Sequence, residues 1–205
     1  MDTFRFRWTF FGVLIVGIVA LNVLMLAVGN TIGFRYFRSN EGPLEVVQLV
    51  VLALVAVSFI ALIFRLRHAS RLIASGAAAL CILMFFREFE TPLRHPTLDF
   101  MASDSMLYYL SVVLSAFILI QVFLNWSHMP AFLGWLTRVE WWPFLFAGIL
   151  FIAGNRFEMA NLPEIEEVLE LNGYVALAIT ATAALYRTIG KTPISRRYAA
   201  HLERG

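Results

Sequence analysis

Long apolar runs separated by short polar segments organise this chain. A helix that crosses a bilayer needs about 20 mostly apolar residues, and six runs approach or reach that length. A shorter run at 130–136, rich in Trp and Phe, is typical of a helix lying on the membrane surface. The pattern predicts an all-α fold, a single transmembrane domain with a short interfacial helix between spans four and five. The expected spans lie at about residues 8–28, 43–64, 72–89, 105–124, 139–155 and 164–186, and a basic tail follows at 187–205.

The composition supports a membrane protein. Of the 205 residues, 60% are hydrophobic and only 15% are charged, whereas about 25% of the residues of a soluble domain are charged. The single cysteine, Cys81, lies inside an apolar run, so an intrachain disulfide is excluded. The chain contains no phosphate-binding glycine loop, zinc-protease helix or serine-hydrolase elbow, and nothing in it indicates nucleic-acid binding.

Basic residues set the expected orientation, because Lys and Arg gather on the cytoplasmic side of membrane proteins. With six spans, eleven of the sixteen basic residues fall on the side of the two termini. We therefore expect a bacterial inner (plasma) membrane protein with both termini in the cytoplasm. A cleaved signal peptide ending near Ala27-Val28-Gly29 is the alternative for the first span, but its apolar run is longer than such peptides use.

Acidic residues show the opposite bias, since eleven of the fourteen fall on the outer side. The densest group opens the sixth span, where Pro163 suits the first position of a helix. At 100° per residue Glu166 and Glu170 share a helix face with Gly173 and Leu177, which indicates a face that packs against other helices. Glu170 lies about two turns inside the helix, beyond the reach of helix capping.

Ionisable groups within a membrane domain are candidate functional residues. We expect carboxylates from several helix ends to form an outward-facing pocket that binds a cation or a proton. The candidate ligand or proton site comprises Glu170, Glu166, Glu45, Gln48 and Glu41. The candidate ion-pair network comprises Arg87, Glu88, Glu90, Arg156 and Glu158. A divalent cation would prefer oxygen ligands, and its candidate ligands are Glu45, Glu166, Glu170 and His95.

These observations favour a binding or accessory membrane protein that holds a cation or docks another membrane protein, with the lipid bilayer as its surroundings. Two other classes stay open. A small cation- or proton-coupled transporter would need a polar path through the inner halves of the spans. A metal-dependent hydrolase of lipid headgroups would need a nucleophile or activated water, for which Ser103, Ser105 and His95 are the obvious helpers. A purely structural role, as ion pairs and helix-end electrostatics, is the competing explanation of the acidic residues.

Overall fold

The computed structural model describes residues 2–33, 43–88, 103–160 and 162–189. Within these ranges every regular element is a helix. Five of the helices are long and apolar enough to cross a membrane. They are α1 (Thr9–Ile32), α3 (Pro43–Arg65), α4 (His68–Arg87), α6 (Asp104–Leu124) and α9 (Pro163–Ile189).

The remaining candidate span is bent. After α6 come the 3-10 helix η2 (Trp126–His128), α7 (Met129–Leu136), the 3-10 helix η3 (Val139–Trp141) and α8 (Trp142–Met159). The stretches Trp126–Leu136 and Val139–Phe157 qualify as a span only together, and they meet at an angle of 87°. The structure therefore confirms an all-helical protein with five to six helices of membrane-spanning character. The short helix predicted at 130–136 is present as α7.

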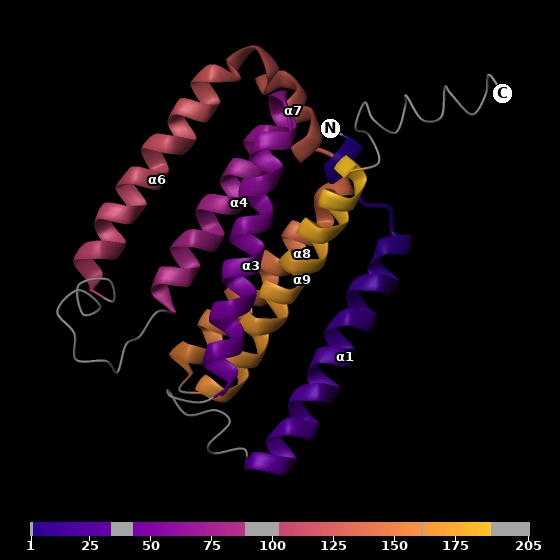
Figure 1. Cartoon of the computed structure of the whole chain (residues 1–205), viewed down its shortest axis with the longest axis vertical. Coiled ribbons are helices and arrows are strands. Elements are labelled where there is room, and N and C mark those ends of the chain that lie inside the picture. Colours follow the sequence, from indigo (N-terminus) through magenta and orange to yellow (C-terminus); the bar gives the residue numbers. More distant parts are fainter. Residues whose placement is uncertain (1, 34–42, 89–102, 161, 190–205) are drawn as a thin grey trace.

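The long helices alternate in direction, so that the chain returns to the end of the bundle at which it begins (Figure 1). Arg187, near the end of α9, reaches the N-terminal segment, where its Nη1 donates hydrogen bonds to the carbonyl oxygens of Thr3 (3.1 Å) and Arg5 (2.8 Å). We call this end the basic end. The opposite end, where α3 and α9 begin and α4 finishes, carries Glu45, Glu88, Glu166 and Glu170, and we call it the acidic end.

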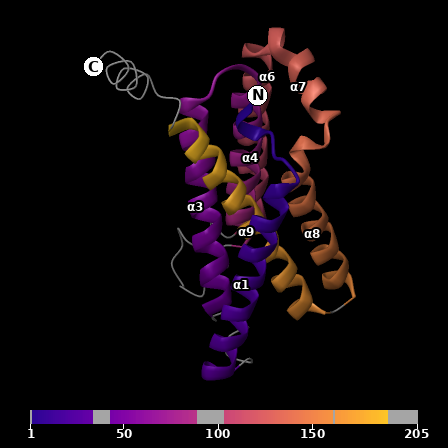
Figure 2. The same cartoon turned by 90° about the vertical axis from the view of Figure 1, so that its right-hand side faces the viewer.

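Helix α9 occupies the middle of the bundle and packs against α8, α3 and α1. Figure 2 shows α9 passing between α3 and α8. Its predicted packing face is buried at Glu170, Leu177, Ala181 and Ala184. The side chains of Leu171, Tyr174 and Thr180 are buried as well, because neighbours cover α9 on several sides.

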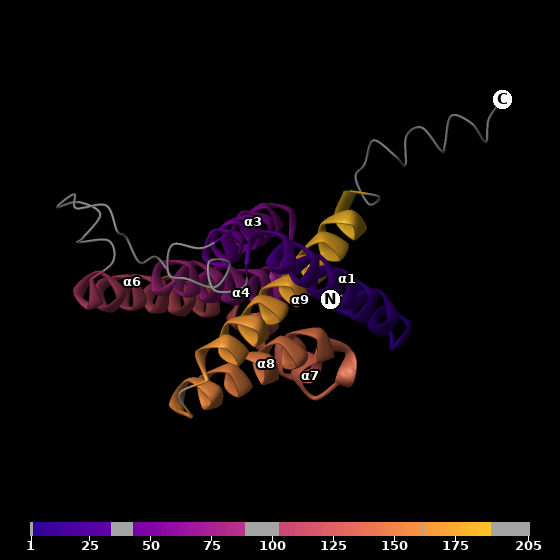
Figure 3. The same cartoon turned by 90° about the horizontal axis from the view of Figure 1, so that it is seen from below.

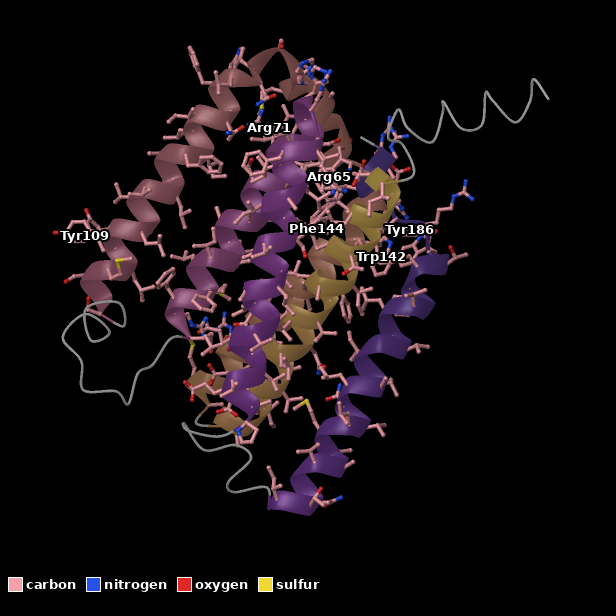
Figure 4. The ribbon with its side chains drawn as sticks, in the orientation of Figure 1. Arg65, Arg71, Tyr109, Trp142, Phe144 and Tyr186 are labelled. Atoms are coloured by element: carbon pink, nitrogen blue, oxygen red, sulfur yellow. The ribbon has the colours of Figure 1, made fainter. Side chains whose placement is uncertain are left out.

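Helices α1 and α6 lie at the edges of the bundle. Figure 3 shows α6 beside α4 and away from α9, and Tyr109 projects from the outer face of α6 (Figure 4). Large apolar side chains on these two helices, such as Val16, Val23 and Leu119, are exposed. An apolar exposed surface of this kind suits contact with lipid. One interhelical hydrogen bond fixes α1, from Asn22 Nδ2 to Asn172 Oδ1 of α9, at 2.8 Å.

Several element boundaries differ from the sequence-based prediction, among them the ends of α8 at Met159 instead of 155 and of α9 at Ile189 instead of 186. The basic segment between the second and third spans contains only two residues outside helices, Leu66 and Arg67, and α4 already begins at His68. Helix α4 ends at Arg87 instead of residue 89. Helix α1 continues four residues past the predicted end at 28, until Gly33 ends it with a φ of 90°, which favours glycine.

Candidate functional site

Helices α4 and α9 meet at the acidic end through Arg87. Its Nη2 donates a hydrogen bond to Glu170 Oε1 at 2.8 Å and lies 3.8 Å from Glu166 Oε1. Its Nε lies 3.5 Å from Glu88 Oε1. Tyr174 completes the group, since its hydroxyl donates to Glu88 Oε1 at 3.2 Å. We call Arg87, Glu88, Glu166, Glu170 and Tyr174 the carboxylate cluster.

The helical period of α9 explains why three members of the cluster lie together. Residues 166, 170 and 174 are spaced four apart, so they form one row along the helix. Helix α8 closes the cluster from another side at Gly154. A Cβ atom at Gly154 would lie 3.1 Å from Glu170 Cγ, so the missing side chain allows α8 to approach the carboxylates closely.

The cluster is largely shielded from solvent. The side chains of Glu170, Glu166 and Glu88 are 3%, 12% and 15% exposed, whereas that of Arg87 is 41% exposed. Burying a carboxylate disfavours its charged form, and a like charge nearby adds to that effect. The pKa of Glu88 is accordingly raised to about 7, first by burial and then by the Glu170 carboxylate, while Arg87 and the Tyr174 hydrogen bond oppose the rise. Burial thus keeps the Glu88 carboxyl protonated to a higher pH than a carboxyl group in water.

Helix α3 joins the acidic end through Gln48. This buried side chain donates from Nε2 to the carbonyl oxygen of Glu167 at 3.2 Å. Gln48 therefore holds the start of α3 against the first turns of α9. Glu45 lies in the first turn of α3, one turn before Gln48, and its participation in a shared ligand site stays a prediction.

The other predicted residues have different outcomes. Arg156 is exposed and makes no ion pair with a side chain that the structure describes. Three predicted site residues, Glu41, Glu90 and His95, lie outside the described part of the chain, as does the side chain of Glu158. Within that part, no three His, Cys, Asp or Glu side chains form a group that could hold a metal ion.

One proposed helper of a hydrolytic site has a structural role. Ser103 precedes α6, and its hydroxyl accepts a hydrogen bond from the backbone N–H of Met106 at 3.2 Å, the contact of a helix N-cap. This bond accounts for one contact of the hydroxyl, and the role of Ser103 as a helper in hydrolysis stays a prediction.

Sequence reasoning missed two contacts. Tyr174 is recognisable in retrospect, because it lies one turn after Glu170 on the same row of α9. The Asn22–Asn172 pair gives a weaker signal, since a single Asn within each apolar run does not reveal its partner.

These features place the chain in the class of all-helical proteins with several helices of membrane-spanning length and a buried ion-pair cluster at one end. No family model matches the chain, and no curated protein or solved structure matches it significantly.

Proposed function

We propose that this protein is a membrane-spanning binding protein whose carboxylate cluster takes up a cation, of which the proton is the simplest. The observation that carries the proposal is the convergence of three carboxyl groups from two helices on one guanidinium, in a place largely closed to solvent. Such a cluster can release one proton when it binds another cation, so that its net charge stays the same. A structural ion pair alone would need only one carboxylate for Arg87.

The carboxylate oxygens of the cluster limit which cations it can bind. Such oxygens bind protons, and they are also preferred ligands of hard divalent cations. The raised pKa of Glu88 favours the proton, because that group changes its charge close to neutral pH. A cationic side chain of a partner membrane protein would meet the same oxygens, so docking of a partner is part of the same proposal.

The test is cation-dependent stability of the purified protein in a neutral detergent. We expect the melting temperature to rise when the pH is lowered from 8 to 5.5, because a ligand of the folded state stabilises it. Added Mg²⁺ or Ca²⁺ should have a smaller effect at pH 8, since no three described side chains form a metal-binding group. Glu170→Gln keeps the shape of the side chain and removes its charge. This variant should fold and lose part of the pH-dependent gain, because the Glu170 charge is the second cause of the raised pKa of Glu88.

Glu140→Gln is the matched control, because Glu140 lies at the basic end, where it pairs with Arg5. It should keep the response of the wild-type protein to added cations. If Glu170→Gln responds to protons and divalent cations as strongly as the wild type, the cluster is not a cation site.

The proposed location is a bacterial inner membrane with both termini in the cytoplasm. The excess of basic residues on one side supports this orientation. An orientation with both termini on one side also agrees with the contact between the end of α9 and the N-terminal segment, since that contact requires the chain to cross the membrane an even number of times.

Reporter fusions test the orientation. Fusions after Arg67 and at the C-terminus should report the cytoplasm, and fusions near Thr97 and Asn161 should report the outside. A C-terminal fusion that is active outside would contradict the six-span topology and would divide the acidic residues between the two sides.

A further inference from the structure

A second charged site lies at the basic end, across the bundle from the carboxylate cluster. It is a cavity of about 610 Å³ between the start of the chain, the start of α8 and the end of α9. Among the residues that the structure describes, its lining includes Arg5, Arg7, Arg187, Glu140 and the rings of Phe6, Trp8 and Trp142. In Figure 4 Trp142 lies in the half of the molecule that carries Arg65 and Arg71, nearer to the middle than they are.

The walls of the cavity are held by specific contacts. The N-terminal segment is fixed to α9 by the two hydrogen bonds from Arg187, whose guanidinium also lies 4.7 Å from the centroid of the Phe6 ring. It is fixed to α8 by Trp142 Nε1, which donates to the carbonyl oxygen of Phe6 at 3.1 Å. The backbone N–H of Phe6 donates to the Glu140 carbonyl oxygen at 3.0 Å. The cavity is therefore built into the fold.

The charge of the lining favours an anion. Three guanidinium groups face one carboxylate, that of Glu140, which lies 3.3 Å from Arg5 Nε. Arg7 is exposed and has no ion pair with a described side chain. Arginine binds phosphate oxygens well, because its planar group offers several N–H donors in a fixed geometry.

The position of the cavity indicates which anion. Arg187 follows Glu170 by 17 residues on one helix, which at 1.5 Å per residue is about 26 Å, close to the ~30 Å thickness of the bilayer hydrocarbon. The rings of Trp8 and Trp142 stack at 5.6 Å beside the cavity, and tryptophan favours the level of the lipid headgroups. Below them, exposed Val13 and Val16 of α1 offer an apolar surface for an acyl chain.

We propose that this cavity binds the phosphate headgroup of an anionic phospholipid on the side of the membrane that carries both termini. The guanidinium groups of Arg7 and Arg187 meet the phosphate, the stacked rings of Trp8 and Trp142 lie on one side of it, and an acyl chain lies along α1. Basic pockets between helices at this level are a recognised way to hold anionic lipids. The site is separate from the carboxylate cluster and does not depend on its function.

The test uses the full chain in neutral detergent and two dibrominated lipids, phosphatidylglycerol and phosphatidylcholine. Bromine quenches nearby tryptophan, and the chain has five tryptophans, so binding at the cavity is read from the part of the quenching that Trp8→Phe removes. We expect phosphatidylglycerol to quench at several-fold lower concentration than phosphatidylcholine. Arg7→Gln should weaken phosphatidylglycerol binding by about fivefold, the effect of one charge near the surface. Trp8→Phe should remove part of the quenching.

Arg67→Gln is the matched control, because Arg67 is exposed between α3 and α4 at the same end and does not line the cavity. It should leave binding unchanged. The proposal is overturned if both lipids quench alike, or if Arg67→Gln weakens binding as much as Arg7→Gln. It is also overturned if inorganic phosphate protects the protein against heat as well as phosphatidylglycerol does, because the ligand would then be the free ion. If Arg7→Gln does not fold, mass spectrometry of the intact wild-type protein with its retained lipids decides, and equal retention of both lipids contradicts the site.

Discussion

Replacing Arg87 with alanine is expected to destabilise the protein by about 3 kcal/mol. Removal of one partner from a buried ion pair typically costs about 3–5 kcal/mol, because the other charge stays buried without compensation. The lower value applies here, since the Arg87 side chain is 41% exposed and water screens part of its charge. The Glu170 carboxylate, which is 3% exposed, would lose its hydrogen-bonded counter-charge and remain buried. Thermal unfolding in detergent should show the effect.

Arg156→Ala is the matched control for this experiment. Arg156 lies in the last turn of α8, also at the acidic end, but its side chain is exposed. A surface substitution of this kind usually changes stability by less than about 0.5 kcal/mol. Equal melting of the two variants would mean that the contacts of Arg87 contribute nothing to the folded state.

The second large effect is a pH dependence that comes from Glu88. Its pKa is raised from 4.5 to about 7 in the folded protein. Between these two values the folded state keeps a proton that the unfolded state has released, so the free energy of unfolding falls as the pH rises through this window. A difference of this size corresponds to roughly 3 kcal/mol lost between pH 4.5 and 7.5.

Other groups titrate in the same range, so the contribution of Glu88 must be measured as a difference. Glu88→Gln cannot ionise and still accepts the hydrogen bond from Tyr174. We expect the variant to lose less stability than the wild type as the pH rises from 4.5 to 7.5. Parallel stability curves for the two proteins would show that Glu88 titrates alike in the folded and unfolded states.

The positions of the helices could be predicted from the sequence because apolar runs and prolines mark them. Pro43 and Pro163 begin α3 and α9 in the structure, as the preference of proline for the first helical turn predicts. The sequence predicts a start of α4 at residue 72, because the basic residues before it favour a turn, whereas the helix begins at His68. Leu66, the extended Arg67 and a φ of 58° at His68 suffice to reverse the chain there, and the side chains of His68 and Arg71 belong to the first turn of the helix.

The carboxylate cluster could be predicted only in part. The period of α9 placed Glu166 and Glu170 on one face, and that inference requires only the geometry of a single helix. Which arginine meets them depends on how the neighbouring helices are rotated, and a single sequence does not contain that information. Helix α8 turns Gly154 toward Glu170, so Arg156, two residues and about 200° further on, points away.

In our proposal, the carboxyl groups that converge on Arg87 hold a proton that leaves near neutral pH. Infrared difference spectra of the purified protein between pH 5.5 and 8.5 test it most directly, since a protonated carboxyl group has its own C=O band. We predict a carboxyl band in the wild type that disappears with a midpoint near pH 7. This band should be absent in Glu88→Gln and shifted to another pH in Glu170→Gln. A wild-type spectrum without such a band, or one that both variants leave unchanged, would contradict the account.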